Sequence, residues 1–232
     1  MQTKQRPNVE ALLAHLPLFN GLAADEIARV AGSTTEIHAA KGDILFYKGD
    51  PCTGFHLLVY GQIKLAFTSP QGSEKVVEIV REGQSFGEAL MFMDKPYIVF
   101  AQALSDSMLL HVSKSGIYAE LERDHNLGRK MLAGLSMRLH QLMGDVESYS
   151  LRSGKQRIIG YLLQELPDRD QDGSNVAIQL TTSKGIIASR LNLTQEHFSR
   201  ILHELISLGL IVVDGRNILI PDVARLRKHD ME

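Results

Sequence analysis

The stretch from Leu193 to Leu205 (LTQEHFSRILHEL) restricts the fold of this chain more than any other part of it. Its apolar residues recur every three or four positions and so share one face of a helix: Phe198, Ile201, Leu202 and Leu205. The opposite face is polar and carries Gln195, Glu196, Ser199, Arg200 and His203. Thr194 precedes the first turn as an N-cap residue, and the helix dipole favours the acidic Glu196 in that turn.

A second short helix and a tight turn are predicted directly before this stretch. Residues 181–191 (TTSKGIIASRL) place Ile187 and Ala188 on an inner face, and Ala188 is small enough for two helices to cross closely. Asn192 occupies the turn, and Asn is, after Gly, the residue that best tolerates a left-handed conformation. Leu193 then fills the corner. Helix, tight turn and helix with this pattern predict a helix-turn-helix.

A β-hairpin is predicted after the second helix. Residues 209–213 (GLIVV) and 218–220 (ILI) are apolar runs joined by Asp214-Gly215-Arg216-Asn217, and an Asp-Gly pair is a strong hairpin signal. The alternative is an ordinary helical hairpin with a solvated polar face. The small residue, the turn and the hairpin occur together, however, and this combination favours a winged helix-turn-helix that binds double-stranded DNA.

The amino-acid composition is compatible with DNA binding but does not by itself indicate it. The 232 residues carry a formal net charge of -2, and residues 151–232 contain 11 Lys and Arg residues against 10 Asp and Glu. Binding to phosphates needs only a local basic face. A single cysteine, Cys52, excludes an internal disulfide. The polar start (MQTKQRPNVE) differs from a signal peptide, and no apolar run has membrane-spanning length. We therefore expect a cytoplasmic protein without a membrane partner.

The region before residue 115 has the pattern of a small antiparallel barrel or roll. Short apolar runs alternate with glycines at intervals of about ten residues. The runs are Ile44–Tyr47, Phe55–Tyr60, Ile63–Phe67, Val76–Val80 and Met108–Val112, and the glycines are Gly42, Gly49, Gly61, Gly72, Gly83 and Gly87. Two short helices, Val9–His15 and Ala24–Ala31, are predicted before them.

A long helix is predicted from about Ser115 to about Tyr149. Apolar residues inside it are spaced alternately by four and three, which is the heptad seam of a two-stranded coiled coil. The seam consists of Leu132, Leu135, Leu139, Leu142 and Val146, with Gly128 and Tyr149 at its ends. The alternative is a helix that packs on its own barrel, a role open to Leu127, Met131 and Met143 beside the seam. The strict alternation favours a homodimer.

Together, the predicted helices and strands indicate an α+β protein in three parts. They are a β-roll with N-terminal helices (1–114), a dimerisation helix (115–150) and a winged helix-turn-helix domain (151–232). Leu151–Gly154 is a predicted hinge, Ile158–Leu166 a helix and Val176–Leu180 a strand.

Two further patterns resemble metal sites without completing them. Residues 168–173 (DRDQDG) match the opening of an EF-hand calcium loop, but the position of its bidentate Glu is Gln179, and a strand follows where a helix should. Cys52 and His56 are four apart, and two ligands do not make a zinc site. Local sequence suggests no catalytic arrangement, so we expect no enzyme.

The order of these parts resembles the Crp/Fnr superfamily of bacterial transcription regulators over essentially the whole chain. Phe86–Pro96 (FGEALMFMDKP) is similar to the cassette that binds the phosphate of cyclic nucleotides in cAMP-responsive members. Leu135–Gln141 (LSMRLHQ) resembles the dimerisation helix, and Glu196–Arg200 (EHFSR) has the E-x-x-S-R form of the Fnr-type recognition helix. The motifs look most like the Dnr branch, which controls denitrification genes in response to nitric oxide.

The resemblance implies a homodimer that binds a palindromic DNA operator with TTGAT half-sites and acts with RNA polymerase. It implies base contacts from Glu196, Ser199 and Arg200. The residues implied for DNA-backbone contacts or for the helix-turn-helix itself are Thr182, Ser183, Arg190, Thr194, Gln195 and His197.

The residues that would bind the effector differ from those of the best-known relatives. In cAMP-binding relatives the cassette ends in Arg followed by Ser or Thr, whereas Tyr97-Ile98-Val99 stands here. A buried phosphate needs a cationic partner, so Gly87 and Glu88, the candidate effector pocket, are interpreted as a structural remnant of a cyclic-nucleotide site that does not bind cAMP. One cysteine is too few for an iron–sulfur cluster.

The Dnr-type resemblance instead implies haem that senses nitric oxide. Its axial ligand stays open among His15, Cys52 and His56, with further histidines at 38, 111, 125 and 140. The alternative function is a cyclic-nucleotide-binding signalling module whose C-terminal domain binds protein.

Overall fold

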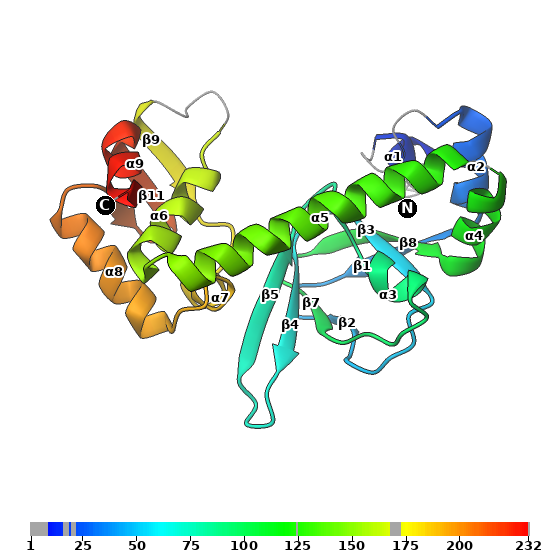
Figure 1. The fold of residues 1–232 in the computed structure, drawn as a ribbon, viewed down its shortest axis with the longest axis horizontal. Coiled ribbons are helices and arrows are strands. Elements are labelled where there is room, and N and C mark those ends of the chain that lie inside the picture. The colour runs from blue at the N-terminus through cyan, green and yellow to red at the C-terminus, as the bar shows by residue number, and fades with distance from the viewer. Residues whose placement is uncertain (1–8, 16–18, 20–21, 124, 168–172, 232) are drawn as a thin grey trace, which may run out of the picture. The chain divides into compact units, whose positions relative to one another are not determined.

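The computed structural model describes residues 9–15, 19, 22–123, 125–167 and 173–231 (Figure 1). The chain divides into two compact units, residues 1–140 and residues 141–232. The division falls inside one long helix, α5 (His125–Leu151). Each unit has its own apolar core, so α5 joins two separately packed bodies.

The first unit is built on two four-stranded antiparallel sheets, which confirms the predicted roll. Their strand orders are β1-β8-β3-β6 and β2-β7-β4-β5. The strands are β1 (Thr34–Ala39), β2 (Ile44–Phe46), β3 (Gly54–Tyr60), β4 (Ile63–Thr68), β5 (Glu74–Val80), β6 (Ser85–Phe86), β7 (Phe100–Ala103) and β8 (Ser107–Ser113). All six predicted turn glycines have a positive φ. At Gly61 a Cβ atom would also lie 2.2 Å from the Ser107 Oγ atom, so only glycine fits there.

Strands β1, β6 and β7 were not among the predicted apolar runs. β1 (TTEIHA) is largely polar and gains its place by pairing along its whole length with β8. β6 has only two residues. β7 (FAQA) lies between β2 and β4, where two neighbours supply its hydrogen bonds. Short or polar strands carry too little periodicity to be read locally, because their partners stabilise them.

Strand β3 is central to the roll because both of its faces are buried. Phe55 and Leu57 pack into a cluster with residues of the covering helices, including Leu127 and Met131 of α5. Leu58 faces the other way and joins the cluster that lines the interior of the roll. This double burial explains why β3 reads as a continuous apolar run.

The helices of the first unit match the sequence with one correction. α1 (Val9–His15) and α2 (Ala24–Gly32) are where they are predicted, and α3 (Glu88–Phe92) follows the cassette glycine. The single helix predicted from Ser115 is wrong, because α4 (Lys114–Arg123) and α5 are separate helices. Only Asp124, which lies outside the described residues, separates the two helices in the sequence, and Asp has a low helix propensity.

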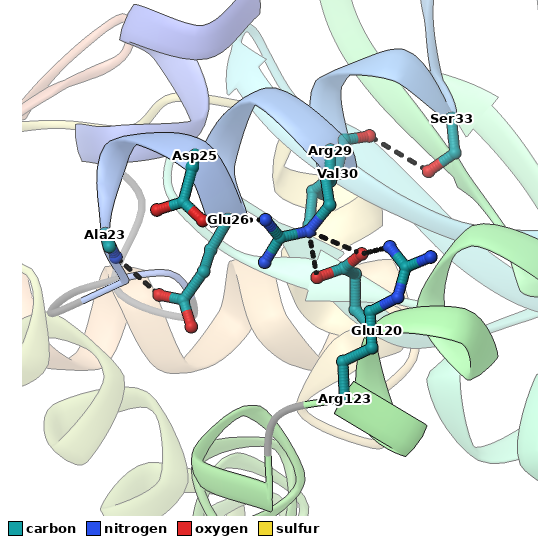
Figure 2. Close-up of polar contacts among 8 residues, drawn as sticks. All are labelled: Ala23, Asp25, Glu26, Arg29, Val30, Ser33, Glu120 and Arg123. Atoms are coloured by element: carbon teal, nitrogen blue, oxygen red, sulfur yellow. Dashed lines mark hydrogen bonds and ion pairs between the residues drawn. The ribbon is translucent and has the colours of Figure 1, made fainter.

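A buried carboxylate holds α4 against α2. Figure 2 shows Glu120 of α4 between Arg29 of α2 and Arg123. The Arg29 Nε atom lies 3.0 Å from both Glu120 carboxylate oxygens, and an Arg123 nitrogen lies 3.2 Å from one of them. Two guanidinium groups therefore compensate the only partly hydrated charge of Glu120.

The second unit is a winged helix-turn-helix, as predicted. It contains α6 (Gly154–Gln164), β9 (Ser174–Gln179), α7 (Lys184–Arg190), α8 (Gln195–Ser207), β10 (Val212–Asp214), β11 (Asn217–Asp222) and α9 (Val223–Met231). The strands form one antiparallel sheet of order β10-β11-β9. The predicted calcium-like pattern lies mostly outside the described residues, and its Gln179 ends a strand. Within the described ranges, no helix combines the length and the apolar content needed to cross a membrane.

Candidate nucleic-acid interface and effector region

The turn between α7 and α8 has the geometry that the sequence predicts. Asn192 adopts a left-handed conformation with φ of 57°. The Leu193 amide donates a 2.9 Å hydrogen bond to the Ala188 carbonyl, which closes the turn. Ile187 and Ala188 are buried, and Leu193 packs against the same core. The small side chain of Ala188 therefore lies where the two helices meet.

Helix α8 presents one polar face outward. The Thr194 hydroxyl accepts a 3.2 Å hydrogen bond from the His197 amide, which confirms the N-cap. Phe198, Ile201, Leu202 and Leu205 are all buried in the core of the unit. Gln195, Glu196 and Arg200 are exposed, and Ser199 and His197 are partly exposed. Buried apolar residues thus fix the rotation of α8 and leave the polar residues free to contact a ligand.

Glu196 and Arg200 lie one helical turn apart and make no ion pair or hydrogen bond with other described residues. Exposed side chains of opposite charge at this spacing commonly pair across a helix surface. Here both remain available for contacts outside the protein.

Of the residues predicted for DNA-backbone contacts or for the helix-turn-helix itself, two have partners inside the second unit and a third is buried. Thr182 is buried, and Ser183 caps α7 by accepting a hydrogen bond from the Ile186 amide. The Arg190 guanidinium lies 2.7 Å from the Asp145 carboxylate of α5. These contacts are consistent with maintenance of the helix-turn-helix, which is one of the two roles predicted for these residues.

Arg157 is an important residue that the sequence did not reveal. From α6 its guanidinium donates hydrogen bonds of 2.7 Å to the Leu191 carbonyl and 3.1 Å to the Asn192 carbonyl. It therefore caps the end of α7 and the turn. No local signal identifies such a contact, because its partners lie more than 30 residues away in the sequence.

The predicted dimer seam is an exposed apolar row on α5. Leu132, Leu139, Leu142 and Val146 are exposed in the single chain, and Leu135 is half-buried. Leu139, in the middle of the row, is 61% exposed. Leu127 and Met131 instead pack on the roll, as one of the two readings of the helix allows, whereas Met143 is exposed. A row of exposed leucines on one helix is typical of an interface.

The cassette residues lie at the interior of the roll. Gly87 has φ of 98° and precedes α3, and Glu88 begins that helix. Burial raises the pKa of the Glu88 carboxyl, and a hydrogen bond with Ser85 opposes this effect. A carboxyl group in this environment offers no positive charge to a phosphate. Gly87 and Glu88 therefore do not form a phosphate site by themselves.

Tyr97 occupies the region where cAMP-binding relatives carry their Arg. It is buried, and its ring stacks on Phe46 with centroids 3.6 Å apart. Burial raises the pKa of the Tyr97 hydroxyl, and a hydrogen bond with Cys52 acts in the same direction. The Cys52 sulfur lies 3.2 Å from the Gly54 carbonyl oxygen. Tyr97 therefore supplies no positive charge where those relatives carry Arg.

His56 is the unusual residue of this interior. It is only 5% exposed, stacks on Phe86 at 5.0 Å and lies 4.9 Å from the ring of its cross-strand partner His111. Burial, and secondarily His111, lower the pKa of His56 to about 3. Its Nδ1 atom is buried without a hydrogen-bond partner in the described part of the chain. Cys52 packs against the apolar cluster that contains Phe46, Phe86 and Tyr97, whereas the side chain of His15 lies outside the described residues.

Known proteins match both units. The model of the cyclic nucleotide-binding domain matches residues 36–124, and that of the Crp-like helix-turn-helix domain matches residues 156–229. The CRP-like cAMP-activated global transcriptional regulator of Mycobacterium tuberculosis is 21% identical, with 95% of this chain and 99% of the relative covered.

Two solved structures extend the comparison over the length of the chain. DNR from Pseudomonas aeruginosa is 33% identical, with 97% of this chain and 99% of that chain covered and a TM-score of 0.52. FixK2 from Bradyrhizobium japonicum is 21% identical, with 84% and 96% covered and a TM-score of 0.73, which supports the fold alone.

Proposed function

The chain belongs to the Crp/Fnr family of transcription regulators, and from this premise we propose that it acts as a homodimer on inverted TTGAT half-sites. It is an effector-controlled DNA-binding regulator and not an enzyme. Relatives of this kind are typically dimeric, and the exposed seam of α5 supports the same assembly here. A two-fold dimer presents two α8 helices to a palindrome about one DNA turn apart.

The observation that carries the operator proposal is the free pair Glu196 and Arg200. Arg can donate to both O6 and N7 of a guanine, and Glu can accept from N4 of a cytosine. Two such side chains on adjacent turns read one G·C pair together. Ser199, between them, contacts a neighbouring base. This arrangement suits the G·C pair of a TTGAT half-site.

Binding to a labelled TTGAT palindrome, followed by fluorescence anisotropy, tests the proposal. We expect the full-length protein to prefer this palindrome over a scrambled duplex of equal length and composition, and added cAMP to leave the preference unchanged. Equal binding to both duplexes would overturn the operator assignment. Tight binding of cAMP without any DNA binding would favour a signalling module whose C-terminal domain binds protein. Once the operator is established, recruitment of RNA polymerase is measured on the same fragment.

We further propose that the effector is nitric oxide sensed through haem, on the basis of the Dnr-like motifs. The residues of the roll fit this group in one respect: His56 is a buried, neutral imidazole with an unpartnered nitrogen, and such nitrogens bind haem iron. When bound, haem would supply an iron that binds nitric oxide. His56 is the candidate holder, Cys52 is the second, and Phe46, Phe86 and Tyr97 supply apolar surface.

The stacked rings of Phe46 and Tyr97 set a condition on this proposal. At 3.6 Å they are in contact, so a flat macrocycle enters the interior only if the two rings separate. Haem titration of the purified protein tests the assignment by absorption. We expect a Soret band that shifts in His56→Phe and is unchanged in His38→Gln. The absence of a band in the wild-type protein would overturn the haem proposal and leave the DNA-binding proposal intact.

A further inference from the structure

Three residues join the end of α5 to the helix-turn-helix. Asp145 and Tyr149 lie four positions apart and so share one face of the last two turns of α5. The Arg190 guanidinium, at the end of α7, donates to the Asp145 carboxylate at 2.7 Å. The Tyr149 hydroxyl donates a 2.6 Å hydrogen bond to the Arg190 carbonyl, and the guanidinium also donates to the Tyr149 oxygen. Both ends of Arg190 are thus held by α5.

The side chains of this cluster are largely shielded from water. The side chains of Arg190 and Asp145 are only 18% and 25% exposed. Burial raises the pKa of Tyr149, so its hydroxyl stays protonated and able to donate. Charge-assisted hydrogen bonds in partly dehydrated surroundings are stronger than the same pairs on an open surface.

The cluster bypasses the predicted hinge. α5 ends at Leu151, and α6 begins after Ser153, whose backbone is extended and whose hydroxyl accepts from the Gln156 amide. Without other contacts, this short link would let α6 to α9 turn as one body. The cluster, however, connects α5 directly to α7 across the link. The compact second unit accordingly begins at Gln141, inside α5, and includes the last turns of that helix.

We propose that Asp145, Tyr149 and Arg190 are positioning residues that lock the helix-turn-helix to α5, so that the direction of α5 sets the direction of α8. Residues 151–154 then do not act as a free hinge while the lock is closed. In the dimer of the proposed function, the lock fixes the separation and rotation between the two recognition helices. It makes the regulator selective for the spacing between half-sites, which no base contact can do.

Operators of different spacing test this inference. Inserting one base pair rotates one half-site by about 35° and moves it by about 3.4 Å. We expect the insertion to weaken wild-type binding about tenfold or more. In Tyr149→Phe and Asp145→Ala, the same insertion should weaken binding only about twofold to threefold, while affinity for a single half-site stays at the wild-type level. These substitutions leave Arg190 in place, because Arg190 is also a candidate phosphate contact.

Controls separate the lock from general damage. Glu204→Gln removes an ion pair with Lys155 in the same unit, at 3.1 Å, without touching the junction between α5 and α7, and should keep the wild-type spacing preference. Asp145→Glu retains the charge and should restore much of the preference. Unfolding by urea reports whether each variant is folded, and Tyr149→Phe removes a single oxygen atom.

A second measurement does not depend on DNA. Trypsin cleaves after Arg152, inside the link, and opening of the lock should increase cleavage there about tenfold in Tyr149→Phe and Asp145→Ala relative to the wild-type protein. An unchanged spacing penalty together with unchanged cleavage would overturn the lock. If the wild-type protein ignores the palindrome, the operator proposal fails, and the cleavage rates alone decide for or against the lock.

Discussion

The guanidinium of Arg157 on α6 donates a 2.7 Å hydrogen bond to the carbonyl of Leu191, the residue that ends α7. A second bond, to the Asn192 carbonyl, holds the turn itself. The last carbonyls of a helix have no partner within the helix, and a positive charge there also suits the helix dipole. One side chain from a third helix therefore stabilises the turn that places the recognition helix.

Replacement of Arg157 by Met should destabilise the second unit. Hydrogen bonds to charged groups contribute about 1.5–3 kcal/mol, so we expect a loss of about 1–3 kcal/mol in the free energy of unfolding, measured with urea. Arg225→Met is the matched control, because Arg225 donates to the Leu208 carbonyl at 2.9 Å from an exposed position. Equal effects of the two substitutions would contradict a special role for Arg157.

Arg200→Ala should weaken operator binding by about 1–3 kcal/mol and relax the preference for the guanine of the half-site. The reason is that the guanidinium is exposed and unpaired, so its removal costs no internal contact. Anisotropy titrations on the consensus operator and on operators changed at that base measure both effects. If the variant distinguished the guanine from other bases as well as the wild-type protein does, another residue would be responsible for recognising this position.

Leu139→Glu should convert the dimer to a monomer, because it places like charges across an apolar seam. Sedimentation velocity measures the mass, and the roll should remain folded since Leu139 is exposed in the single chain. Met137→Glu is the control, because Met137 is also exposed but lies off the seam and should leave the dimer intact. A dimeric Leu139→Glu protein would refute the seam.

His56 should make the first unit less stable in acid. Its pKa of about 3 in the folded state lies below the ordinary value of 6.5, so the unfolded chain binds the proton more readily. The stability that the neutral ring permits is therefore present above pH 6.5 and is lost as the pH falls from about 6.5 towards 3. The loss is at most about 1.4 kcal/mol per pH unit.

Urea unfolding at pH 7 and pH 5 measures this effect. We expect the stability of His56→Phe to fall less between these two values than that of the wild-type protein. His38→Gln changes an exposed histidine and serves as the control. If the stability of His56→Phe and that of the wild-type protein changed equally with pH, the pKa of His56 would not be lowered in the folded protein, and the prediction would be wrong.

The sequence by itself determined the parts of this protein and their local geometry. The spacing of Phe198 to Leu205 fixed which face of α8 is buried, because a helix has one period. Asn192 and Gly61 marked turns because few residues tolerate a positive φ. Leu132 to Val146 marked an apolar row that the single chain leaves exposed.

Only the tertiary structure decided which polar groups meet. The fold brings together three pairs from distant segments: Arg157 with Leu191, Arg190 with Asp145, and His56 with His111. The periodicity of the sequence does not predict such pairs. The same holds for the short strands β6 and β7, which exist because their neighbours provide hydrogen bonds. Local patterns report burial, which is a property of one segment, whereas a polar contact needs two segments and depends on how the whole chain packs.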